Sequence, residues 1–247
     1  MTRLAALIMI GVAVVLLAFF WLLKRKNPYA GLRALAPFKA LGKARLQAIE
    51  DGSRMVIMLG NNLLSQEISI SGMGGMPILK KLAGQAVLGD HAPVAMSGEG
   101  SLACLSQMIL AGAYRDSLAP ELFSNDQSQF AGASPFAYLA TCLAEGFDDN
   151  NSALVLAGHF RPEMVLLVDL AGREGLFCLA DSDAPGAQAL FYASTMHTLI
   201  GEEFYAGGTN LRTHPMQAAS LRTQDALRIL IAVALIVGVA LKLMGIL

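Results

Sequence analysis

The chain has 247 residues, of which 55% are hydrophobic and 15% charged, with a formal net charge of −1. Its mean hydropathy of +0.53 exceeds that of ordinary soluble domains, and two apolar runs near the ends account for the excess. Between these runs, Leu46 to Leu221 holds 18 acidic and 7 basic residues, a net charge of −11, so we expect no nucleic acid partner.

The first apolar run, Leu4 to Leu23, has 20 residues without a charge. At about 1.5 Å per helical residue it covers roughly 30 Å, the thickness of the hydrocarbon core of a bilayer. The basic triplet Lys24-Arg25-Lys26 follows it, where a cleaved signal peptide would have small residues. We therefore predict that residues 1–23 form an uncleaved transmembrane helix.

A basic juxtamembrane linker is predicted over residues 24–49. It contains seven Lys and Arg residues between Lys24 and Arg45 and no acidic residue before Glu50. Such a segment is attracted to anionic headgroups, although it is equally compatible with a role in setting membrane orientation alone. Its second half, Pro37 to Glu50, is predicted to be an amphipathic helix on the membrane surface.

Residues 50–221 show short apolar strands alternating with helices, and the strands are continuously apolar, as in a parallel sheet covered on both faces. The pattern predicts one α/β domain with a Rossmann-like parallel sheet, in which Ser117 to Gly132 is a mobile loop and Ser134 caps a helix. Strands are expected at Met55–Leu59, Pro93–Ser97, Leu122–Asn125, Ala153–Ala157, Leu176–Ala180 and His197–Ile200. Helices are expected at Met76–Leu88, Ser101–Tyr114, Pro135–Glu145, Pro162–Arg173 and Pro185–Ala193.

A second transmembrane helix is predicted over residues 222–247, where Ala226 to Leu247 holds only Arg228 and Lys242 as charges, both near its ends. Basic residues gather on the inner flanks of both predicted spans. By the positive-inside rule, the α/β domain is cytosolic and both termini lie outside the cell membrane. The lipid bilayer is thus the expected partner, together with partner subunits or self-association through the spans.

A ligand site is predicted where the strands end, because open parallel sheets bind ligands outside their carboxyl ends. These ends are polar and rich in glycine, although turns favour such residues without any ligand. The candidate ligand-binding residues are Asn61, Asn62, Gly98, Glu99, His159, Asp181, Asp183 and Glu202.

No complete catalytic or metal-binding motif is present. The run Gly72-Met73-Gly74-Gly75 resembles a dinucleotide fingerprint, but Pro77 stands where its third glycine belongs. Ser101 follows a predicted strand without the GxSxG pattern of a nucleophile elbow, and the four histidines lack metal-ligand spacing. We therefore assign no catalytic residue and no metal site, and the cofactor stays unknown.

The three cysteines are Cys104, Cys142 and Cys178. Their odd number and wide spacing disfavour disulfides, and their apolar surroundings predict that all three are buried as small hydrophobic residues.

The segments HTLIGEEFYAGG (His197 to Gly208) and RTQDALRIL (Arg222 to Leu230), with the glycine-rich Ser69 to Gly84, resemble the DUF6754-like family of uncharacterised bacterial membrane proteins. The resemblance covers nearly the whole chain. It implies a helix at each end of an α/β domain, and it carries no catalytic residue. It also marks Gly201-Glu202-Glu203 and Gln224-Asp225 for a structural or binding role.

Three functions are compatible with these features. The first is a membrane-anchored protein whose cytosolic α/β domain binds a small ligand or partner subunit without catalysis. The second is a membrane-bound enzyme that uses a nucleotide or nucleotide-linked substrate on the Rossmann-like scaffold. The third is a structural subunit in which the two spans pair through Gly11, Ala234 and Gly238.

Overall fold

The computed structural model describes residues 2–23, 26–29, 31–61, 70–86, 91–211 and 215–243. The chain forms two compact units. One combines Met1–Arg33 with His214–Leu247, and the other is Ala34–Thr213.

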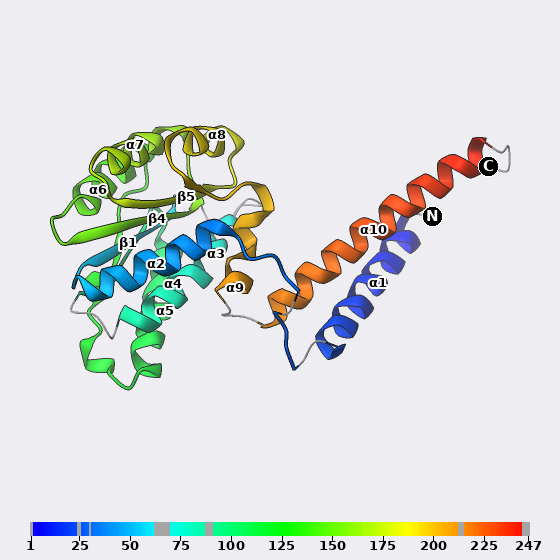
Figure 1. Cartoon of the computed structure of the whole chain (residues 1–247), viewed down its shortest axis with the longest axis horizontal. Helices are drawn as coiled ribbons and strands as arrows, with labels where there is room; N and C mark the ends of the chain where they lie inside the picture. The colour runs from blue at the N-terminus through cyan, green and yellow to red at the C-terminus, as the bar shows by residue number, and fades with distance from the viewer. Residues whose placement is uncertain are drawn as a thin grey trace. The chain divides into compact units, whose positions relative to one another are not determined.

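The unit Ala34–Thr213 is built on a six-stranded parallel sheet with strand order β3-β2-β1-β4-β5-β6. The chain runs outward from β1 to β3, returns to the middle for β4, and runs outward again to β6 (Figure 1). The predicted α/β parallel sheet is confirmed. The strands are β1 (Arg54–Gly60), β2 (Val94–Ser97), β3 (Ser128–Phe130), β4 (Asn151–His159), β5 (Phe177–Ser182) and β6 (His197–Thr198).

Helices cover both faces of this sheet (Figure 1). One face carries α2 (Ala36–Glu50), α3 (Ile70–Gly74), α4 (Met76–Ala86) and α5 (Gly100–Asp116). The other carries α6 (Pro135–Gly146), α7 (Val165–Arg173) and α8 (Pro185–Ser194). The short helix α9 (Gly207–Asn210) and the 3-10 turns η1 (Pro120–Leu122), η2 (Asn125–Gln127), η3 (Pro162–Met164) and η4 (Gly201–Ala206) complete the unit.

The central strands are apolar throughout because both of their faces are buried. In β1, Val56 and Met58 point toward α6 and α7, in one core cluster with Leu154 and Leu156 of β4. Ile57 and Val155 are equally buried but belong to the opposite face. This double burial explains why sequence alternation is absent from these strands.

Helix starts follow their local signals. Ser134 caps α6 as predicted, accepting a hydrogen bond from the Ala137 N–H at 3.2 Å, with Pro135 in the first turn. In α8, Pro185 again occupies the first turn. A cap such as Ser134 satisfies an N–H group that has no partner within the helix.

The strand predicted at Leu122–Asn125 is wrong. That segment runs from the last residue of η1 to the first residue of η2, and the edge strand β3 lies further on, at Ser128–Phe130. The residues of β3 are half-buried or exposed, so they lack the apolar signature of the central strands. This strand is defined by its pairing with β2, in which Ala95 aligns with Ser128. It lies within Ser117 to Gly132, the region predicted to be a mobile loop.

The helix predicted over Pro37–Glu50 is present as α2, but its apolar side packs on the sheet, so a membrane surface is not needed to cover that side. It contacts β1, β4, β5 and β6 and buries Phe38, Leu41 and Ala48. The apolar side of this amphipathic helix is therefore covered by protein.

The unit Met1–Arg33 with His214–Leu247 contains α1 (Thr2–Leu23) and α10 (Pro215–Leu243), which lie side by side (Figure 1). Within the described residues, one helix is long and apolar enough to cross a membrane, namely α10 over Met216–Leu243. The apolar part of α1 described here, Met9–Leu23, is shorter, so a second span stays a prediction.

The apolar part of α10 is not a buried core helix, because no residue of its most apolar window is fully buried. Neither Gly11 nor Gly238 has an atom within 4 Å of an added Cβ, so these glycines do not mark a close helix contact. The half-buried side of α1 instead runs along Ala13, Leu16, Leu17 and Phe20, at helical spacing.

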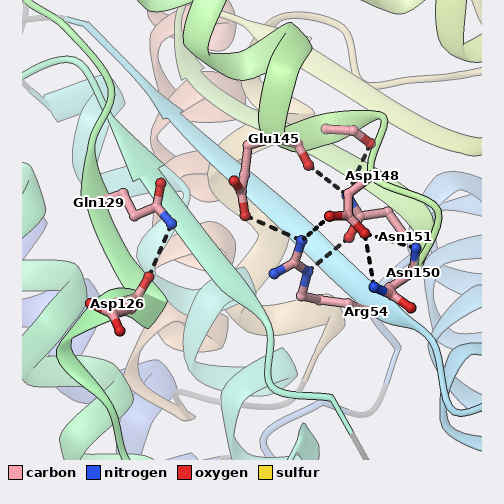
Figure 2. Close-up of polar contacts among 8 residues, drawn as sticks. Arg54, Asp126, Gln129, Glu145, Asp148, Asn150 and Asn151 are labelled. Atoms are coloured by element: carbon pink, nitrogen blue, oxygen red, sulfur yellow. Dashed lines mark hydrogen bonds and ion pairs between the residues drawn. The ribbon is translucent and has the colours of Figure 1, made fainter.

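At the amino-terminal end of the sheet, hydrogen bonds and ion pairs between polar side chains connect β1 to β4 and to the end of α6 (Figure 2). Arg54 donates through Nε to Asn151 Oδ1 at 2.8 Å, and its guanidinium lies 3.2 Å from Glu145 and 3.8 Å from Asp148. The hydrogen bond from the Asn150 N–H lowers the pKa of the Asp148 carboxyl, and the positive charge of Arg54 lowers it further. Every charge of this cluster has a partner, so its role is structural.

Candidate functional site

The strongest polar cluster in the described residues lies at the opposite, carboxyl-terminal end of the sheet, where β4, β5 and β6 finish. His159 ends β4, Asp181 and Asp183 stand at the end of β5, and Glu203 and Tyr205 lie on η4 after β6. We call these five residues the acidic edge. Their grouping follows from the parallel sheet, which brings the strand ends to one side.

His159 and Asp183 form a close pair, with Nδ1 of the ring 2.6 Å from Oδ1 of the carboxylate. Both side chains are about one-fifth exposed, so the pair lies just below the surface. The contact fixes the orientation of the imidazole and turns Nε2 away from Asp183. This arrangement is typical of a histidine that is positioned to bind or to exchange a proton.

Asp181 is fully buried, and neither of its carboxylate oxygens has a hydrogen-bond partner among the described residues. The nearby Gln188 uses its Nε2 to bond the Ser182 carbonyl oxygen at 3.0 Å. Burial raises the pKa of Asp181 to about 8. The nearby Ser182 N–H and Gln188 amide act in the opposite direction, and the negative charges of Asp183 and Glu203 reinforce the effect of burial. An unpaired buried carboxyl is costly, so its presence indicates a role other than stability.

The acidic edge extends along the turn η4, where its residues are half-buried or exposed. Glu203 is half-buried and acts electrostatically on Asp181, whereas Glu202, the residue predicted from the sequence, is exposed on the same turn. Tyr205 is 41% exposed, and burial together with Asp183 and Asp181 raises the pKa of its hydroxyl. The 3-10 geometry of η4 decides which glutamate turns inward, and a sequence has no periodic signal for so short a turn.

The predicted residues at the ends of β1 and β2 adjoin the end of β4, because β1 pairs with β4 and Gly60 aligns with His159. The Gly98 N–H donates to the Gly60 carbonyl at 2.8 Å, and the Asn61 N–H donates to the His159 carbonyl at 3.3 Å. Glu99 caps α5 by accepting from the Leu102 N–H at 2.9 Å, and it also accepts from the Ser101 hydroxyl. These contacts are structural, and Asn62 lies outside the described residues.

Tyr138 of α6 fills the space beneath these two strand ends. Its hydroxyl donates to the Met96 carbonyl and accepts from the Gly60 N–H, both at 3.2 Å, and burial raises its pKa well above the ordinary value. Sequence patterns did not single out Tyr138, because its hydroxyl meets residues far away in the chain.

The glycines that resemble a dinucleotide fingerprint serve close packing. A Cβ at Gly74 would strike the Phe204 ring, and a Cβ at Gly75 would strike the Ala157 carbonyl oxygen. Gly72 similarly faces Leu102. The helix after β1 therefore approaches β4 and η4 closely, which is an alternative reason for a glycine run at this place.

Two surface hollows, of about 430 and 460 Å³, lie at the amino-terminal end of the sheet, away from the acidic edge. Among the described residues, no group of three or more His, Cys, Asp and Glu side chains could hold a metal ion. Cys142 and Cys178 are buried as predicted, but Cys104 is exposed because it lies on the outer side of α5.

A family model described as a domain of unknown function, DUF6754, matches residues 1–247. No curated protein and no solved structure matches the chain. The family match agrees with the resemblance seen in the sequence.

Proposed function

We propose that this protein is membrane-anchored and that its α/β unit binds a small ligand at the acidic edge. The chain belongs to the DUF6754 family, whose function is unknown. The observation that carries this proposal is Asp181, a buried carboxyl without a hydrogen-bond partner in the described residues, beside the paired His159 and Asp183. A bound ligand would supply the missing partner.

The apolar surface of α10 supports the membrane anchor. Its exposed apolar side chains include Ile229, Leu235 and Ile236, each at least 66% exposed, and a bilayer would cover them. We further propose that α1 is the second span of a two-pass inner-membrane protein. In this topology the α/β unit is cytosolic and both termini lie outside, as the distribution of Lys and Arg favours.

Membrane anchoring is tested by expressing the full chain in bacterial cells and washing the membranes with alkaline carbonate. We expect the protein to stay in the membranes until detergent is added. Impermeant labelling of single cysteines placed at either terminus should succeed from outside intact cells, whereas a cysteine at the exposed Glu174 should stay unlabelled. Release by carbonate would exclude the anchor, and labelling at position 174 alone would reverse the topology.

Ligand binding is tested by dialysing the detergent-solubilised full chain against a small-molecule extract of its expression host and identifying retained compounds by mass spectrometry. We expect one compound class to be retained by the unmodified chain. Asp183→Ala should reduce its retention about tenfold, since one charge-assisted hydrogen bond contributes roughly 1.5–3 kcal/mol. Asp169→Ala, at an exposed carboxylate on α7, is the matched control. Equal retention by all three proteins would contradict the proposal.

A second candidate function is an enzyme that acts on a nucleotide or nucleotide-linked substrate. The His159–Asp183 pair favours it, because an oriented imidazole can serve as a general base through Nε2. The two functions differ in one measurement: an enzyme would convert the retained compound over time in a His159-dependent manner, whereas a binding protein would return it unchanged.

A further inference from the structure

We infer that the ligand of the acidic edge carries a protonated amine whose charge pairs with the Asp181 carboxylate. This inference rests on the proposed function and names the chemical class of the ligand. It is drawn from the hydrogen-bonding state of Asp181 and from the charges around it.

Hydrogen bonding argues for a donor group. The two oxygens of an ionised carboxylate can accept about four hydrogen bonds, and neither Asp181 oxygen has a partner in the described residues. An ammonium group supplies three N–H donors in a compact volume. The side-chain amide of Gln188 bonds the Ser182 carbonyl and also favours the ionised form of Asp181, but it makes no hydrogen bond of ordinary geometry to either Asp181 oxygen.

Charge argues for a cation. Asp183 and Glu203 act on Asp181 with charges of the same sign, and His159 is held by Asp183. An anionic group such as a phosphate would be repelled by the carboxylates of Asp183 and Glu203, and it would oppose the ionisation of Asp181. A neutral hydroxyl could donate one hydrogen bond but would leave the negative charge of the edge uncompensated.

A metal ion fits less well than an amine. The hard divalent cations require six or more oxygen ligands, or several carboxylates converging on one point. The described residues contain no such group of side chains. An organic cation needs only one buried carboxylate, with Tyr205 and Glu203 at the more exposed end of the edge to receive the rest of the ligand.

Binding of an amine must be coupled to proton release. Burial and the two neighbouring acids keep Asp181 protonated near neutral pH, since its pKa is raised to about 8. An ammonium ion stabilises the ionised form, so Asp181 loses its proton when the ligand binds. Release should approach one proton per ligand near pH 7 and decline toward zero near pH 9, where Asp181 is already ionised.

The test uses isothermal titration of the full chain in detergent with putrescine, agmatine, spermidine and ethylamine, and with 1,4-butanediol as the neutral counterpart of putrescine. Titrations in phosphate and in Tris differ in buffer ionisation enthalpy and so report the number of protons released. We expect at least one amine to bind with proton release near pH 7, and butanediol not to bind at about 10 mM.

Asp181→Asn should weaken amine binding at least tenfold and abolish proton release, whereas Asp169→Asn should leave both unchanged. Glu203→Gln, on the half-buried side of η4, should weaken binding two- to fivefold and provides a second variant if Asp181→Asn does not fold. Failure of all four amines to bind, binding of butanediol as tight as that of putrescine, or full binding by Asp181→Asn would overturn the inference. The dialysis experiment decides the proposed function separately, because a retained compound without an amine would support that function and refute this inference.

Discussion

Asp181→Asn is expected to raise the melting temperature of the unliganded protein at pH 8.5 and to change it little at pH 4.5. The folded-state pKa of Asp181 is raised to about 8 from an ordinary 3.8. Both states are protonated below pH 3.8, so the group has no effect there. As the pH rises from 4 to 8 the unfolded chain ionises first, and the stability contributed by the protonated folded form is progressively lost.

Asparagine does not titrate, so the gain in stability of Asp181→Asn over the unmodified protein grows as the pH rises. Since one pKa unit corresponds to about 1.36 kcal/mol, the gain at pH 8.5 should be on the order of 5 kcal/mol, or roughly 10–20 °C for a unit of this size. Thermal melts of the full chain in detergent, followed by circular dichroism at both pH values, measure it. Asp169→Asn at an exposed position is the control. An equal shift at both pH values would mean that Asp181 is not a buried acid.

Gly75→Ala is expected to destabilise the α/β unit by roughly 2–4 kcal/mol. The added Cβ would strike the Ala157 carbonyl oxygen of β4 and approach Leu59 to 2.9 Å. A backbone atom of a central strand cannot move aside cheaply, so α4 would have to shift away from the sheet. The backbone of Gly75 itself is one that alanine can adopt, since its φ is not positive. The effect therefore reports close packing alone.

The measurement uses the buried thiols of Cys142 and Cys178. Burial raises the pKa of both to about 12, so they react with a maleimide dye only when the unit unfolds. In a Cys104→Ala background, the labelling temperature of Gly75→Ala should fall by roughly 5–10 °C. Gly112→Ala, in α5 with open space around its Cβ, should instead raise it slightly, since alanine stabilises a helix by about 0.5–1 kcal/mol over glycine. Equal melting of both variants would contradict the packing role of Gly75.

Local chemistry explains the parts of the fold that were predicted correctly. The continuous apolar run Met55–Leu59 needs burial on both faces, and that requirement leads to a parallel sheet with helices on each side. Ser134 before Pro135 sets the start of α6 through hydrogen bonds within one turn. The carboxyl ends of β4 and β5 were likewise expected to carry His159, Asp181 and Asp183, because strand direction alone places them together.

The missed features depend on contacts between distant parts of the chain. The strand β3 is polar and becomes a strand by pairing with β2, and α2 has an amphipathic pattern that serves a membrane and a sheet equally well. The inward turn of Glu203 instead of Glu202 follows from the 3-10 geometry of η4. Cys104 shows the same limit, since apolar neighbours in sequence did not decide which side of α5 is covered.

The sequence by itself therefore determined the apolar terminal segments, the α/β class and the set of acids at one end of the sheet, because each depends on composition or on periodicity over a few residues. The tertiary structure alone decided that Asp181 is buried without a partner and that the glycines near β1 serve close packing. Desolvation and steric contact are properties of neighbours in space. Gly75 meets Ala157, and Glu203 meets Asp181, only when the sheet has formed.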